Sequence, residues 1–69
     1  MPYVQSTALE RVSYDDAART LRATFRATGR TYVYEDVPQV IYDRLLFADS
    51  MGKYFNAHVH GRFPFHEED

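Results

Sequence analysis

Residues 31–49 read TYVYEDVPQVIYDRLLFAD, and the hydrophobic period changes within this stretch. Its first six residues are rich in β-branched and aromatic side chains, which favour a strand. Pro38 holds Val37 in an extended conformation and suits the start of a helix, because the missing N–H of proline costs nothing there. After the proline, apolar residues recur three and four positions apart, as on one face of a helix. The stretch predicts a strand near 31–35 followed by a helix near 38–48.

Two further strands are predicted upstream of this stretch. Residues 20–27, TLRATFRA, alternate between apolar side chains on one face and arginine or threonine on the other, which is typical of a half-buried strand. Gly29 fits a tight hairpin turn into the next strand. Residues 8–14 predict a first strand in which Leu9 is out of phase with Val12. Leu9 therefore either precedes the regular strand or is separated from Val12 by a β-bulge.

Downstream, Ser50 is a good N-cap for a second helix near 51–59. The predicted fold class is α+β, in which a three-stranded antiparallel meander is followed by two short helices packed on one face (β-β-β-α-α). The whole chain, 1–69, is expected to form one domain. We expect about 3–65 to be ordered and 66–69 to form a solvated acidic tail.

Composition excludes several classes of protein. The chain has 69 residues, no cysteine and a formal net charge of −2. Disulfides, thiolate chemistry and cysteine-based zinc sites are therefore excluded, and no apolar run approaches the ~18 residues that a membrane span needs. His58 and His60 point in opposite directions on a helix, so they do not predict a metal site. We expect a cytoplasmic, non-catalytic protein without a cofactor or metal.

The polar face of the second predicted strand carries arginine, which is typical of a solvated strand face and also fits a surface for phosphates. Arg22 and Arg26 lie two positions apart on that face, and Arg11 falls on the neighbouring strand. Tyr32 and Tyr34 share a face of the third strand. The pattern favours both rings in the core, whereas the opposite register would make them a stacking platform for RNA bases.

The chain also resembles a known family, the KTSC domain. The most specific matches are a Tyr-x-Tyr followed by Val-Pro, and an Ala-x-Ser-x-Gly-x-Tyr-Phe-Asn run. The matching residues, in order, are Val4, Ser6, Tyr14, Asp15, Leu21, Phe25, Gly29, Tyr32, Val33, Tyr34, Val37, Pro38, Tyr42, Ala48, Asp49, Ser50, Gly52, Tyr54, Phe55 and Asn56. The resemblance covers roughly residues 3 to 65.

This resemblance implies a small binding domain. The family takes its name from a C-terminal extension of some lysyl-tRNA synthetases, and that association implies RNA as a ligand. The present chain departs from the pattern at its end, where His66-Glu67-Glu68-Asp69 replaces a basic segment. It also has Val59-His60 where members often have Ile-Arg. The lost positive charge lowers the expected affinity for phosphates.

Two ligand classes follow from these residues. RNA would be held by Arg11, Arg22 and Arg26, with Tyr32 and Tyr34 added if they face solvent. A protein partner would instead contact exposed apolar side chains, for which the candidates are Val33, Phe47, Phe63 and Phe65. A second copy of the chain is also a candidate partner, because a homodimer would extend a small core.

Overall fold

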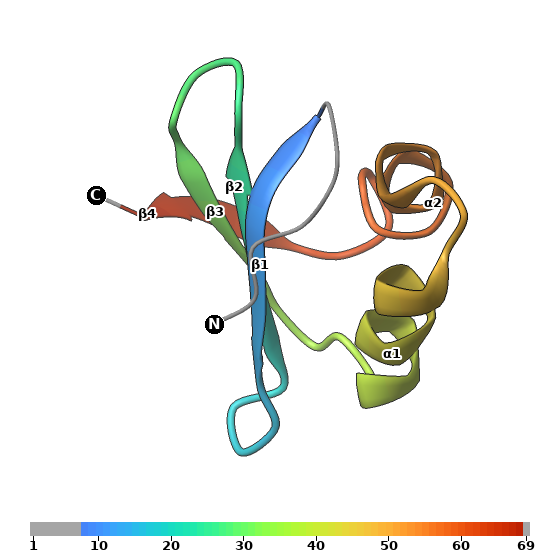
Figure 1. Cartoon of the computed structure of the whole chain (residues 1–69). Coiled ribbons are helices and arrows are strands. Elements are labelled where there is room, and N and C mark those ends of the chain that lie inside the picture. Colours follow the sequence, from blue (N-terminus) through green and yellow to red (C-terminus); the bar gives the residue numbers. More distant parts are fainter. Residues whose placement is uncertain (1–7, 69) are drawn as a thin grey trace.

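Four strands and two helices follow one another along residues 8–68, the part of the chain that the computed structural model describes (Figure 1). Their bounds are β1 (Leu9–Asp15), β2 (Thr20–Phe25), β3 (Thr31–Tyr34), α1 (Gln39–Phe47), α2 (Met51–His58) and β4 (Phe65–Glu68). The predicted α+β class, its meander and its two helices are confirmed. The fourth strand was not predicted.

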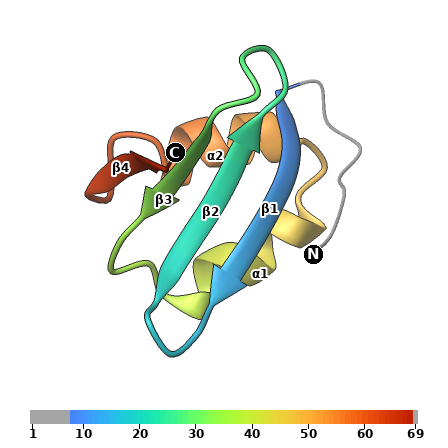
Figure 2. The same cartoon turned by 90° about the vertical axis from the view of Figure 1, so that its left-hand side faces the viewer.

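The strands form one antiparallel sheet in the order β1-β2-β3-β4. Both helices lie on the same side of this sheet (Figure 1), and Figure 2 shows them behind the strands when the sheet is viewed face-on. The chain leaves β3, forms the two helices and then returns to pair β4 with the free edge of β3. The sheet therefore has a helix-covered face and a second face, which we call the open face.

A β-bulge in β1 resolves the phase of Leu9. The register pairs Leu9 with Phe25 and then Arg11 with Thr24, so β1 contains one extra residue between the two pairs. The bulge places Leu9 on the same face as Val12, and both side chains are buried. Of the two predicted explanations, the bulge is confirmed. Its cause is hydrophobic, because a regular strand would turn Leu9 toward the open face.

The core lies between the sheet and the helices. Leu21 is paired directly with Tyr34, so both side chains point to the helices, and both are buried. From α2, Phe55 packs edge-to-face against Tyr34 and Phe25, with ring centroids 5.3 and 5.5 Å apart. Tyr32 points the same way and is half-buried. The core interpretation of the two tyrosines is confirmed.

Local signals place the turns and caps as expected. Gly29 has a φ of 71°, in the left-handed region that favours glycine, and it connects β2 to β3. The Ser50 side chain accepts a hydrogen bond from the Lys53 backbone N–H at 3.3 Å and caps α2. Pro38 is the N-cap of α1 rather than its first residue, so the helix begins one position later than predicted. No helix within residues 8–68 is long and apolar enough to cross a membrane.

The expectation that the ordered part ends near residue 65 was wrong for the acidic residues that the structure describes, although His66 and Glu67 are exposed to solvent as expected. His66, Glu67 and Glu68 belong to β4, whereas Asp69 lies outside the described residues. β4 supplies hydrogen-bond partners to β3, pairing His66 with Val33 and Glu68 with Thr31. Two arginines on the meander compensate the acidic charges of β4, which is why a charged segment can remain in the sheet.

Candidate functional site

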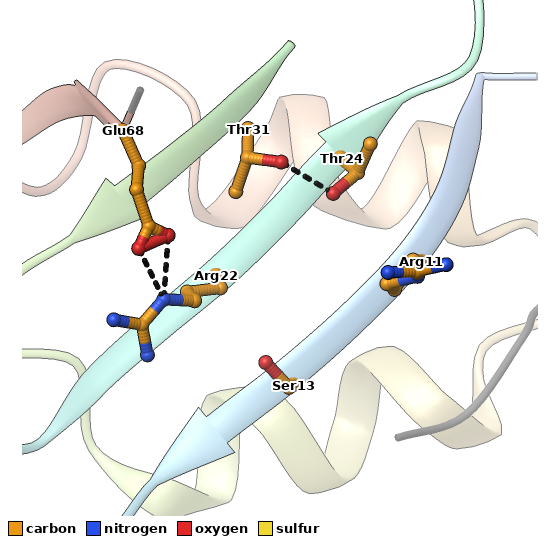
Figure 3. Close-up of a pocket in the computed structure, with 6 residues that line it drawn as sticks. All are labelled: Arg11, Ser13, Arg22, Thr24, Thr31 and Glu68. Carbon is orange, nitrogen blue, oxygen red and sulfur yellow. Dashed lines mark hydrogen bonds and ion pairs between the residues drawn. The ribbon is translucent and has the colours of Figure 1, made fainter. Parts of the chain in front are cut away.

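The open face of the sheet contains a small polar hollow, which we call the polar hollow. Its volume is about 130 Å³, and it is lined by Arg11, Ser13, Arg22, Thr24, Thr31 and Glu68 (Figure 3). The register explains this grouping, because Arg11 is paired with Thr24, Ser13 with Arg22, and Thr31 with Glu68. Alternation along four neighbouring strands thus brings two guanidinium groups and three hydroxyls to one place.

An ion pair crosses the polar hollow between the second and fourth strands. Arg22 Nε donates to both carboxylate oxygens of Glu68, at 2.9 and 2.8 Å. Figure 3 shows the two terminal nitrogens of Arg22 directed away from the carboxylate. The hydrogen bond to Glu68 raises the pKa of Arg22, and the same contact lowers the pKa of Glu68. Both side chains are partly exposed, so the pair is modest in energy, but it ties β4 to the meander.

This ion pair makes stability depend on pH in a defined direction. The pKa of Glu68 is lower in the folded chain than in the unfolded chain, so the stabilisation is present above the unfolded pKa and is lost as pH falls through the folded pKa. We expect urea midpoints of the wild type and Glu68→Gln to differ most near neutral pH and to converge below about pH 4. A difference that stays constant across this range would contradict the prediction.

The arginines predicted to bind RNA do not form one surface with the tyrosines. Arg11 and Arg22 line the polar hollow, whereas Arg26 lies beyond the end of β2, where its Nη2 donates to the Leu9 carbonyl at 3.4 Å. Tyr32 and Tyr34 are on the opposite side of the sheet, and Tyr34 is only 2% exposed. The stacking platform predicted for outward-facing tyrosines is therefore wrong.

A second hollow lies on the helix side, between the edge of the sheet and α2. It has a volume of about 280 Å³ and is lined by Phe25, Tyr32, Tyr34, Asn56, His60 and Phe65. We call it the aromatic hollow. The Phe65 ring from β4 lies 5.8 Å from that of Tyr32 and 5.4 Å from that of Tyr34, centroid to centroid. Phe65 nevertheless remains 51% exposed, so one wall of the hollow is an aromatic ring in contact with water.

Two polar groups complete the rim of the aromatic hollow. Asn56 comes from α2 and His60 from the turn after it, where the His60 backbone N–H donates to the Phe55 carbonyl at 2.9 Å. Both side chains are exposed. Apolar walls with a few hydrogen-bonding groups at the rim are typical of sites that take one flat or apolar group. The sequence analysis included Asn56 among the residues that match the family but did not predict its position at this rim. It did not predict that His60 lies at the rim.

The four candidates for a protein-partner surface are separated in the structure. Val33 was wrongly expected to be available, because it is 6% exposed and lies between Arg22 and His66 in the register. Phe63 is partly buried against the core. Phe47 on α1 is 88% exposed but does not line the aromatic hollow. Of the four, only Phe65 is both exposed and part of the aromatic hollow.

The structure also shows an arginine that the sequence analysis missed. Arg30 Nη1 lies 3.1 Å from the Glu67 carboxylate, so it neutralises the second acidic side chain of β4. The only feature of the sequence that could have drawn attention to Arg30 is its position between Gly29 and the first residue of β3. Within residues 8–68, no group of three or more histidine and carboxylate side chains is arranged to hold a metal ion.

Comparison with known proteins identifies relatives of this chain. The sequence model of the KTSC domain family matches residues 5–63. A protein from Tsukamurella paurometabola is 41% identical over 63 residues, which is 91% of this chain and 92% of that protein. An uncharacterised protein from Stutzerimonas stutzeri is 40% identical over 53 residues, 77% of this chain and 73% of that protein. The crystal structure of a KTSC domain protein from Yersinia pestis superposes with a TM-score of 0.94 at 29% identity, covering 99% of this chain and 94% of the other.

Proposed function

The chain belongs to the KTSC domain family, and on that premise we propose that it is a non-catalytic binding module whose aromatic hollow takes an apolar side chain of a protein partner. The observation that carries this proposal is the position of Phe65. Phe65 is half-exposed on a four-residue edge strand, and its ring forms the outer wall of a hollow of about 280 Å³. A side chain inserted beside it would cover the ring.

The partner's chemistry follows from the surroundings of the hollow. Aromatic rings form its walls, so an aromatic or large aliphatic side chain fits it, and such anchors commonly dominate protein interfaces. The outer edge of β4 is not paired within the described sheet, so an extended segment of the partner could add to it. Asn56 and His60 would then supply hydrogen bonds to the backbone of that segment.

Charge favours a protein over RNA at this site. The chain carries a net charge of −2, and the two glutamates of β4 neutralise Arg22 and Arg30. Arg11 and Arg22 lie on the other side of the sheet from the aromatic hollow. A polyanion that followed these arginines could not place its bases on Tyr32. RNA, which the family resemblance implied as a ligand, bound through the arginines that the strand pattern indicated, is therefore the alternative outcome of the test.

The test is selection from a displayed library of random linear peptides on the wild-type chain. We expect enriched peptides to share an aromatic or large aliphatic residue. Their affinity should fall by about thirtyfold in Phe65→Ser, as for the loss of a central interface anchor. Phe47→Ser is the matched control and should change affinity by less than about twofold, because that ring is exposed outside the hollow. Phe65→Leu should retain most of the binding.

Three outcomes would contradict the proposal. Enriched peptides that bind Phe65→Ser as well as the wild type would place the site elsewhere. Self-association of the wild type that is lost in both phenylalanine variants would make a second copy the partner. Binding of labelled single-stranded RNA that falls with salt at a log–log slope of about −2, and is lost in an Arg22→Gln, Arg26→Gln variant, would make RNA the ligand.

A further inference from the structure

The carboxylate of Glu68 is an anion that the fold itself brings to the polar hollow. Glu68 comes from the last strand of the described chain and reaches a hollow whose other five lining residues belong to the meander. Those five are two arginines, two threonines and a serine, so Glu68 is the one acidic side chain among them. Figure 3 shows its carboxylate over Arg22, beside the threonine pair.

We propose that the polar hollow is a binding site for a phosphoryl group. In the free protein, the Glu68 carboxylate is an internal anion that occupies the place beside Arg22 where the phosphoryl group would bind. This site is separate from the aromatic hollow, so the proposal does not depend on the proposed function. Arg22 already binds an oxyanion through Nε, and its terminal nitrogens point elsewhere. A guanidinium group can bind a phosphate through two donors at once.

The donors around the hollow suit a phosphoryl group better than a second carboxylate. Arg11 and Arg22 are diagonal neighbours on adjacent strands, and both line the polar hollow, so two guanidinium groups contribute to its wall. The Thr24 and Thr31 hydroxyls bond to each other at 2.7 Å, which uses one of their two hydrogens and leaves the other for a ligand. A carboxylate has too few oxygens to use all of these donors.

The chain offers a matched pair of variants. Glu67→Gln and Glu68→Gln each remove one negative charge from neighbouring positions of β4, but Glu67 is paired with Arg30 on the other side of the strand. A general effect of net charge would be equal in the two variants. A gain in phosphate affinity that results from removal of the internal anion would appear only in Glu68→Gln.

The experiment is titration of the ¹⁵N-labelled full chain with inorganic phosphate at constant ionic strength, followed by NMR. We expect Glu68→Gln to bind phosphate roughly three- to fivefold more tightly than the wild type, the factor that corresponds to an exposed ion pair. Shifts should centre on Ser13, Arg22 and Thr24. Glu67→Gln should match the wild type, and Arg22→Gln added to Glu68→Gln should abolish binding.

A second arm identifies the source of the phosphoryl group. A short single-stranded oligouridylate replaces phosphate in the same titrations. An equal gain in Glu68→Gln for both ligands assigns the site to phosphodiesters, and a gain for phosphate alone assigns it to phosphate or a terminal phosphoryl group. Equal gains in Glu67→Gln and Glu68→Gln, or shifts away from the polar hollow, would overturn the proposal. Phe65→Ser should leave phosphate affinity unchanged. A negative result in the phosphate titration would therefore overturn only the polar-hollow proposal, and a negative result in the peptide selection only the aromatic-hollow proposal.

Discussion

Phe55→Ala is expected to lower the free energy of unfolding by about 3–5 kcal/mol. Phe55 is 1% exposed and its ring contacts those of Phe25 and Tyr34, which joins α2 to β2 and β3. Truncation to alanine would remove these ring contacts and leave a cavity in a tightly packed interior. A chain of 69 residues has a total stability of about 3–10 kcal/mol, so the variant should be largely unfolded or close to it.

Chemical denaturation of wild type and variant measures this loss directly. Phe47→Ala provides the control, because it makes the same substitution in the other helix at a side chain that is 88% exposed. We expect its effect to stay below about 0.5 kcal/mol. Similar midpoints for the two alanine variants would show that Phe55 is not the centre of the core.

Leu45→Ala is expected to cost about 2–5 kcal/mol. Leu45 is the buried residue of α1 and is fully inaccessible to solvent, so the attachment of that helix depends heavily on one side chain. The same substitution at the next position, Leu46→Ala, is the control, because Leu46 is 38% exposed. We expect the control to cost under about 1 kcal/mol.

Hydrogen exchange separates two ways in which Leu45→Ala could act. If α1 detaches locally, its amides between Gln39 and Phe47 should exchange much faster while β1 and β2 stay protected. If the helix and sheet form one cooperative unit, protection should fall together across all elements. A midpoint equal to that of Leu46→Ala would contradict the prediction, since it would mean that α1 is held by its other residues.

β4 contributes a side chain to each of the two hollows. The strand supplies Phe65 to the aromatic hollow and Glu68 to the polar hollow, on opposite faces of the same sheet edge. The ion pairs of its glutamates with Arg22 and Arg30 are therefore part of the architecture of both sites, and not only a means of keeping an acidic segment soluble.

Local patterns in the sequence were sufficient to predict the three-stranded meander and the two helices. Alternation in 20–27 assigned Leu21 and Phe25 to one face, and the change of period at Pro38 placed the first helix to within one residue. The mismatch at Leu9 left a bulge as one of two explanations, and the register decided between them. These features depend on the preference of neighbouring residues for one backbone conformation and on which side must be buried, and both are properties of a short segment.

Only the tertiary structure decided that residues 65–68 form a strand and which residues line the two hollows. Arg22 and Glu68 are 46 positions apart, and no local signal links them. Taken alone, His66-Glu67-Glu68 is a charged run that favours solvent. It becomes a strand because β3 has a free edge and because Arg22 and Arg30 lie where its charges arrive. The sequence thus determined each surface that is built from one segment, whereas the hollows, which need side chains from distant segments, existed only once β4 had paired with β3.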